Sequence, residues 1–188
     1  MTNPTRKKNK EYRSREYLTL DEVNTLIECA EGGRKFQLRN SLLLLMMFRH
    51  GFRCTEIANL KWDSILWLEN KIAISRAKNG LDGVHNLLPD ELEKLTELRH
   101  NQKSNSPYIF QSERGLPLSE AAIGKLVKRL GETAQLGIKV HPHQFRHACG
   151  YYMANKGYTT RDIQAYLGHR NIQNTEKYTA LSTARFDN

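Results

Sequence analysis

The sequence predicts a mainly α-helical domain that contains one small antiparallel β-sheet. Apolar residues recur at helical spacing in both halves of the chain, for example in YLTLDEVNTLIECAEGG near the start. Short β-rich runs, SILWL, KIAIS and VHNLLP, fall together between residues 64 and 89. The chain has 188 residues, about the size of one domain. These three observations favour a single compact domain with the sheet embedded among helices.

Start and stop signals define the first helices. Thr19 followed by Glu22 forms a capping-box pattern, and two glycines at 32–33 end the first predicted helix. The segment RKFQLRNSLLLLMMFRHG predicts a longer, largely buried helix that ends at Gly51. A short helix, TEIANL, is expected at residues 55–60.

The β-rich runs predict a hairpin and a third short strand. Asn79, Gly80, Asp82 and Gly83 lie between KIAIS and VHNLLP, where a hairpin needs residues that tolerate positive φ. Lys78 falls at the tip of this hairpin. Helices are then expected in PDELEKLTELRHNQ (89–102), SEAAIGKLVKRLGETAQ (119–135), the segment after Pro142, TRDIQAYLG (160–168) and IQNTEKYTALS (172–182).

Charge points to a polyanionic partner. The net charge is +9 and the isoelectric point is near 9.5. Nucleic acid is favoured over a membrane because no basic amphipathic helix with Trp or Phe anchors is evident. Residues 1–16 predict a flexible basic arm, either a solvated tail or a DNA contact. Its candidate DNA-binding residues are Arg6, Lys7, Lys8 and Lys10.

Cysteine usage and hydropathy indicate a cytoplasmic protein. Cys29, Cys54 and Cys149 are odd in number and far apart, which fits neither a disulfide framework nor a CxxC metal site. The longest apolar run, SLLLLMMF, falls well short of the roughly 20 residues that cross a bilayer. No apolar signal-peptide region follows the basic N-terminus.

The segment HPHQFRHA concentrates polar side chains at a predicted helix start. With Pro142 at the first helical position, His143 and Arg146 lie on one face of the helix. His143 and His147 also have the spacing of a zinc pair. No HExxH glutamate, cysteine or carboxylate cluster accompanies them, so no metal is expected. His141 is interpreted as a helix-entry residue and His147 as a supporting core histidine.

Other chemically active residues also lie near the ends of predicted elements. Arg53 precedes the short helix, and Glu56 follows three residues later. His169 comes directly after Gly168, which is expected to end a helix, and Tyr178 comes nine residues further on. Side chains at the ends of elements can converge on one site.

Five of these segments together resemble the tyrosine recombinase (phage integrase) family. They are GFRCTEIANL, RAKNG, HPHQFRHA, LGHRN and NTEKY, in the family's order and spacing. The resemblance implies a tyrosine recombinase catalytic domain over residues 17–182, after the arm and before a tail at 183–188. Within the family the chain is most similar to the short enterobacterial invertases of fimbrial phase variation, which share its compact size, its HGFR and YLGHRN phrases and the HPHxxRHxCG pattern of its HPHQFRHACG segment.

The resemblance implies transfer of a DNA phosphate to Tyr178 and back. Arg53 and Arg146 would clamp the phosphate, because planar guanidinium groups match its oxygens. Tyr178 would be the nucleophile, since a phenol with a pKa of about 10 becomes reactive when a neighbouring group accepts its proton or stabilises its anion. His143 and the arginines could do both.

Three further roles follow from the resemblance. Lys78 would be the general acid for the leaving 5′-oxygen, with a solvated loop lysine as the alternative and Arg76 only two residues away. His169 would hydrogen-bond to the scissile phosphate, and Glu56 would support Arg53. The reaction needs no metal, ATP or other cofactor, because the energy of the cleaved bond is kept in the 3′-phosphotyrosine.

The implied partner is double-stranded DNA with inverted-repeat sites, bound in the bacterial cytoplasm at the nucleoid. Inversion of a fimbrial promoter segment by a homo-oligomer, a tetramer on DNA, is expected, with accessory DNA-bending proteins possible. Many relatives carry an additional N-terminal domain, and Arg53 comes too early in this sequence for one, so the arm is expected to contact phosphates in its place. The alternatives are a type IB topoisomerase-like enzyme, a non-catalytic DNA-binding regulator on the same fold, or a basic protein without a DNA role.

Overall fold

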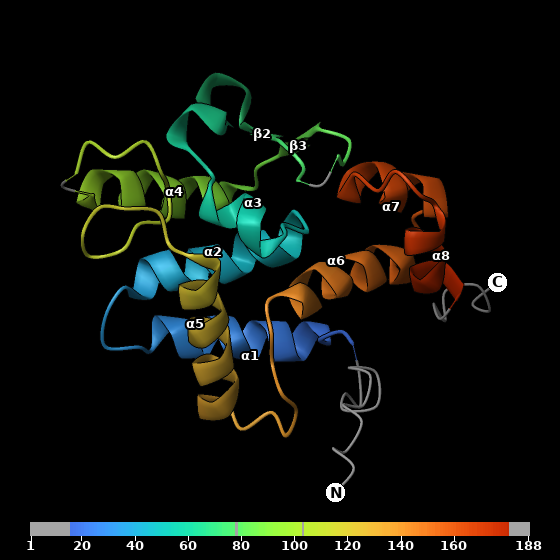
Figure 1. Cartoon of the computed structure of the whole chain (residues 1–188), viewed down its shortest axis with the longest axis horizontal. Coiled ribbons are helices and arrows are strands. Elements are labelled where there is room, and N and C mark those ends of the chain that lie inside the picture. The colour runs from blue at the N-terminus through green and yellow to red at the C-terminus, as the bar shows by residue number, and fades with distance from the viewer. Residues whose placement is uncertain (1–15, 78, 103, 181–188) are drawn as a thin grey trace, which may run out of the picture.

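A computed structural model of the chain describes residues 16–77, 79–102 and 104–180. Lys78, the four candidate arm residues and the predicted tail lie outside the described residues. The elements are α1 (Leu20–Glu31), α2 (Gln37–Arg49), α3 (Cys54–Ala58), β1 (Ile65–Leu66), β2 (Lys71–Ile74), β3 (Gly83–Asn86), α4 (Pro89–Asn101), α5 (Glu120–Thr133), α6 (His143–Asn155), α7 (Thr160–Leu167) and α8 (Gln173–Ala180) (Figure 1). The predicted fold class, mainly α with one small antiparallel sheet, is confirmed.

Helix α2 runs through the centre of the core. Every residue from Asn40 to Phe48 is buried, because α1, α3, α4 and α6 all contact this helix. The run SLLLLMMF therefore forms a core helix, as its length predicted. Gly51, just beyond the helix, has a φ of +60° and packs so tightly against Leu167 that a Cβ atom would clash. Both constraints require glycine at this position.

The small sheet has the order β1-β2-β3, and both pairs are antiparallel. Ile72 of β2 pairs with His85 of β3, and Ile72 and Ile74 face the core. The first strand is shorter than SILWL suggested. Only Ile65–Leu66 is extended, because 3-10 turns occupy Trp62–Ser64 and Trp67–Glu69 on either side.

Two helix boundaries position the motif residues. Helix α6 begins at His143, so Pro142 is the N-cap and not the first helical residue as predicted. The shift of one position leaves His143 and Arg146 three residues apart on the same helical face. Helix α7 ends at Gly168 in the left-handed conformation, with a φ of +67°, which confirms its predicted role as a stop.

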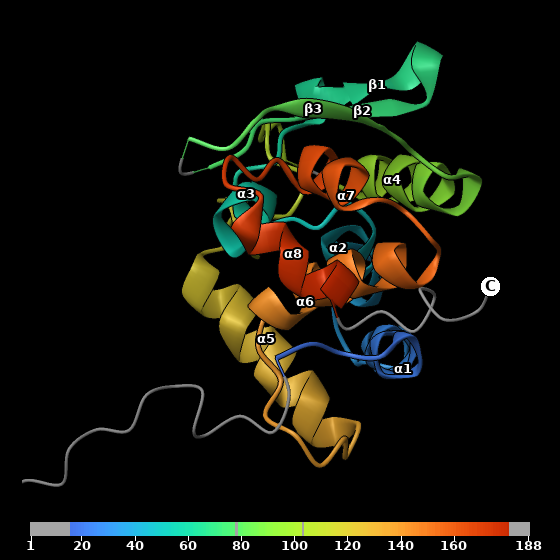
Figure 2. The same cartoon turned by 90° about the vertical axis from the view of Figure 1, so that its right-hand side faces the viewer.

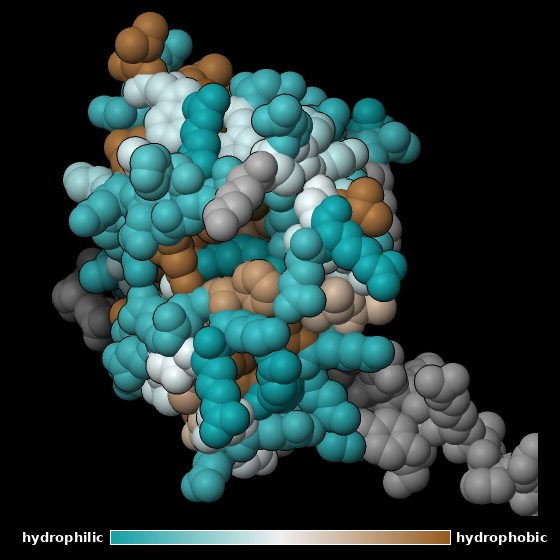
Figure 3. All heavy atoms as spheres, turned by 90° about the vertical axis from the view of Figure 1, so that its left-hand side faces the viewer, coloured by the Kyte–Doolittle hydropathy of each residue, from teal (hydrophilic) through white to brown (hydrophobic). Residues whose placement is uncertain are grey.

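The elements that carry the motifs gather on one side of the molecule. Figure 2 shows α3, α6, α7 and α8 there, below the sheet. The main-chain N–H of Leu81, between β2 and β3, donates to the carbonyl of Gly168 at 3.2 Å and so ties the hairpin to the exit of α7. The opposite face is largely hydrophilic (Figure 3). Among the helices of the described residues, none combines the length and apolarity needed to cross a bilayer.

Replacing Leu44 by alanine should lower the free energy of unfolding by about 2–5 kcal/mol, because its fully buried side chain would leave a cavity in the core. Urea unfolding measures the change. Leu68→Ala is the matched control, since that side chain is fully exposed, and its effect should stay within about 0.5 kcal/mol. Equal losses in the two variants would contradict the burial of α2.

Candidate active site

Arg146 is a buried cation held by main-chain carbonyl groups. Only 1% of the residue is exposed. Its Nη1 donates to the carbonyl of Gly51 at 2.6 Å and its Nη2 to the carbonyl of Leu167 at 2.7 Å. Burial, and then the charges of Arg53 and Arg76, lower the pKa of Arg146 to about 10, so it remains charged at neutral pH. These bonds use two of its five N–H donors, which leaves donors for an oxyanion.

Arg53 lies at the start of α3 and is bound by Glu56. Its Nη1 donates to Glu56 Oε1 at 2.5 Å, and its main-chain N–H donates to Glu56 Oε2 at 2.9 Å. The same Nη1 lies 3.4 Å from the carbonyl of Ala77 on the hairpin. A fifth of the Arg53 side chain is exposed, so the guanidinium is fixed in place and still reachable. Glu56 thus contacts both the main chain and the guanidinium of Arg53, and its supporting role stays a prediction.

Arg76 is a third arginine of this cluster, and the sequence motifs predict no role for it. Its Nη1 donates to Glu56 Oε2 at 3.0 Å, and its Nη2 donates to the carbonyls of His50 and Tyr166, each at 2.8 Å. A signal was present in the sequence. Alternation along β2 places residue 76 on the same inward side as Ile72 and Ile74.

Glu56 is the carboxylate that links the two arginines. Burial alone would raise its pKa, but the main-chain hydrogen bond from Arg53 and the charge of Arg76 outweigh burial and lower the pKa below its usual value. Glu56 also accepts the main-chain N–H of Ala77 at 3.0 Å. One carboxylate therefore fixes α3, β2 and the base of the hairpin.

The two candidate catalytic histidines are neutral at neutral pH. His143 lies at the exposed start of α6, where partial loss of hydration and then the charges of Arg146 and Lys177 lower its pKa to about 4. His169 is buried, and its Nδ1 lies 2.9 Å from the hydroxyl of Thr175. Burial and then Arg146 lower the pKa of His169 to about 3. Each ring can thus act as a hydrogen-bond donor and as an acceptor.

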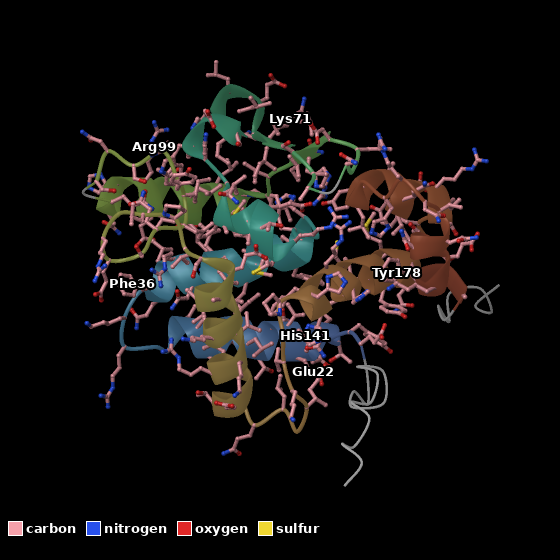
Figure 4. All side chains as sticks on the ribbon, in the orientation of Figure 1. Glu22, Phe36, Lys71, Arg99, His141 and Tyr178 are labelled. Carbon is pink, nitrogen blue, oxygen red and sulfur yellow. The ribbon has the colours of Figure 1, made fainter. Side chains whose placement is uncertain are left out.

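Tyr178 is buried against α6, with 1% of the residue exposed (Figure 4). Its ring stacks on that of His169 at a centroid distance of 6.4 Å. A Cβ atom at position 150 would lie 2.6 Å from the Tyr178 ring, so Gly150 makes room for it. Burial raises the pKa of Tyr178 above its ordinary value, although Arg146 acts in the opposite direction.

The phenol contacts His147, which the sequence predicts only as a supporting core histidine. The Tyr178 hydroxyl lies 2.9 Å from Nδ1 of His147. Burial and then His143 lower the pKa of His147 to about 3, so the ring is neutral and Nδ1 can accept the phenolic hydrogen. The rings of His143 and His147 lie 4.4 Å apart, edge to face. Across the described ranges, no group of three or more His, Cys, Asp or Glu side chains could hold a metal ion.

Replacing Glu56 by glutamine should flatten the acid dependence of stability. A carboxylate whose pKa is lowered in the folded state stabilises the fold above its unfolded value of about 4.3, and this contribution is lost as pH falls through the folded value. The wild type should therefore lose stability below about pH 4.3 more steeply than Glu56→Gln. Urea unfolding across the acid range measures both slopes, with Glu97→Gln on α4 as an exposed control. Parallel curves for all three proteins would contradict the ion-pair interpretation.

Comparison with known proteins places this arrangement in a family. The profile of the Phage integrase family matches residues 16–185. The type 1 fimbriae regulatory protein FimB of Escherichia coli strain K12 is 39% identical over 184 residues, which cover 95% of this chain and 92% of that protein.

Solved structures of recombinases are also similar to this chain. The crystal structure of XerA recombinase superposes with a TM-score of 0.78 at 27% identity, over 90% of this chain and 62% of that chain. The pre-cleavage complex of XerH site-specific recombinase bound to its difH substrate has a TM-score of 0.75 at 22% identity, over 89% of this chain and 51% of that chain, and this likeness concerns the fold. The chain belongs to the phage integrase family of tyrosine recombinases, as its motifs predicted.

Proposed function

We propose that this protein is a site-specific DNA recombinase that cuts and rejoins DNA through a 3′-phosphotyrosine on Tyr178. The observation that carries the proposal is the convergence of Tyr178 with the anchored guanidinium of Arg146. The neutral rings of His147 and His169 lie beside the same phenol. Likeness to the fimbriae regulatory protein FimB favours inversion of a fimbrial promoter segment as the biological outcome.

The charges of the site suit a phosphodiester. Arg53, Arg76 and Arg146 face a single carboxylate, Glu56, in this cluster, and the histidines are neutral. A bound phosphate would balance this excess, and negative charge that grows on its non-bridging oxygens would be stabilised by donors already in place. His169 would add a hydrogen bond to the same phosphate.

In the cleavage step the Tyr178 oxygen attacks phosphorus and the bond to the 5′-oxygen breaks. The phenolic proton passes to a neutral histidine, either His143 or His147. The leaving 5′-oxygen takes a proton from Lys78, in its proposed role as general acid. Attack by a 5′-hydroxyl of a partner strand then reverses each transfer, so the balance needs neither water nor ATP.

The phenol has to become accessible before it can attack. Tyr178 is covered and hydrogen-bonded to His147, so α8 must shift when DNA binds.

The proposed partner is double-stranded DNA with inverted repeats, bound by a tetramer of this protein. The proposed catalytic domain spans residues 17–182, with an arm at 1–16 before it and a tail at 183–188 after it.

Covalent trapping tests the nucleophile. Wild type mixed with fragmented genomic DNA from its source, without divalent metal, should give an SDS-stable adduct at a few inverted repeats. Tyr178→Phe should give none and keep its DNA affinity, because only one hydroxyl is removed. Arg146→Lys should slow adduct formation by about 10²–10³-fold. Adducts scattered over all sequences would favour a topoisomerase, and no adduct with DNA binding retained would favour a regulator.

Deleting residues 1–12 tests the arm. Contacts of Arg6, Lys7, Lys8 and Lys10 with phosphates would release counterions, so the deletion should weaken binding and flatten the plot of log affinity against log salt. Each lost phosphate contact should reduce the slope by about 0.9. An unchanged slope in a binding titration would identify the arm as a solvated tail.

A further inference from the structure

The ring of His169 contacts a buried hydroxyl that has no role in the proposed reaction. Nδ1 of His169 lies 2.9 Å from Oγ1 of Thr175. Thr175 is fully buried, and His169 is also buried. Thr175 belongs to the first turn of α8 and comes three residues before Tyr178. One short helix therefore carries both the contact with His169 and the proposed nucleophile.

The main chain of His169 is held separately, by Gln164 of α7. Its N–H donates to the carbonyl of Gln164 at 3.0 Å, and its carbonyl accepts Nε2 of Gln164 at the same distance. The preceding residue, Gly168, has the left-handed conformation that ends α7. With the main chain fixed, the direction of the imidazole depends on rotation about its side-chain bonds. The hydrogen bond to Thr175 opposes that rotation.

The hydroxyl of Thr175 is used differently from those of other helical threonines. The hydroxyls of Thr25, Thr96 and Thr133 each donate to the carbonyl four residues earlier in their own helix, at 2.7–3.0 Å. Such local bonds are a common use of a threonine hydroxyl inside a helix. The hydroxyl of Thr175 instead meets a side chain outside its helix. This bond therefore serves a tertiary contact between α8 and the exit of α7.

The contact also determines which ring nitrogen can reach a phosphate. Nδ1 faces Thr175, and within the described part of the chain the ring makes no second hydrogen bond, so Nε2 is left for the phosphate. A neutral ring that donates through Nε2 has a lone pair on Nδ1, and a buried lone pair needs a donor. A threonine hydroxyl can donate or accept, so it can supply that donor when a phosphate binds.

We propose that Thr175 is a positioning residue that directs Nε2 of His169 toward the scissile phosphate and links this contact to the helix of the nucleophile. The inference rests on the proposed function, because it concerns His169 in the same reaction. Thr175 and Tyr178 are three residues apart and so share one face of α8. The rings of His169 and Tyr178 lie nearly parallel, at 20°. The packing of α8 thus places both the phosphate donor and the phenol.

The contact itself can be measured without DNA. Long-range ¹H–¹⁵N spectra of histidine-labelled protein should contain ring signals that are absent from His169→Ala. Thr175→Ser keeps a hydroxyl and should leave these signals in place. Thr175→Val has nearly the same shape without the hydroxyl and should shift the Nδ1 signal. An unmoved Nδ1 signal in Thr175→Val would overturn the inference, whether or not the protein cuts DNA.

The rate of adduct formation on Tyr178 tests the positioning role. Thr175→Val should slow the adduct by about 3- to 10-fold, the effect of one lost hydrogen bond, and should leave DNA affinity unchanged. Thr175→Ser should restore the rate. In a His169→Ala background, Thr175→Val should slow the reaction no further, because the ring that it positions is gone. The same slowing in both backgrounds would overturn the positioning role and leave only a packing role.

Thr179→Val is the matched control on the same helix. Its hydroxyl lies 2.8 Å from that of Thr160 on α7, so this variant loosens α8 at another point. Any effect of Thr179→Val should be equal with and without His169. If Thr175→Val fails to fold, Thr175→Ala removes the same hydroxyl with a smaller side chain. Absence of any wild-type adduct would contradict the proposed function, whereas equal adduct rates for wild type and Thr175→Val would contradict only this inference.

Discussion

Two carbonyl groups just beyond the last turn of α2 hold the buried cations on which the site depends. The carbonyl of His50 accepts Arg76, and the carbonyl of Gly51 accepts both Arg76 and Arg146. Carbonyls near a helix C-terminus lack intrahelical partners and carry the negative end of the helix dipole. Guanidinium groups satisfy them here, which offsets the loss of hydration that burial imposes on a charged group.

This anchoring produces a site with fixed positive charge next to the buried phenol of Tyr178. Glu56 neutralises part of the charge of Arg53 and Arg76, and the positive charge that remains favours an anionic ligand. The phenol of Tyr178 is held in its neutral form, because burial disfavours the phenolate. Its hydroxyl is hydrogen-bonded to His147. In the proposed reaction this covered hydroxyl would attack only after DNA binds and α8 shifts.

The sequence by itself determined the fold class and most of the residues that converge. Apolar spacing defined the helices, because burial of one face follows from the helical repeat. Glycines at positions 51 and 168 marked helix ends, because only glycine readily adopts the left-handed conformation found there. Arg53, Arg146 and Tyr178 stood out because their chemical types occur in a fixed order at element ends. Pattern and local backbone preference were enough for these predictions.

Only the tertiary structure decided which polar groups pair. Arg146 and Gly51 are 95 residues apart in sequence, and His147 and Tyr178 are 31 apart. Periodicity predicts that such side chains face inward, but a hydrogen bond also depends on distance and direction, which are fixed when whole elements pack. For this reason Arg76 went unassigned, although its inward position was readable from the strand repeat.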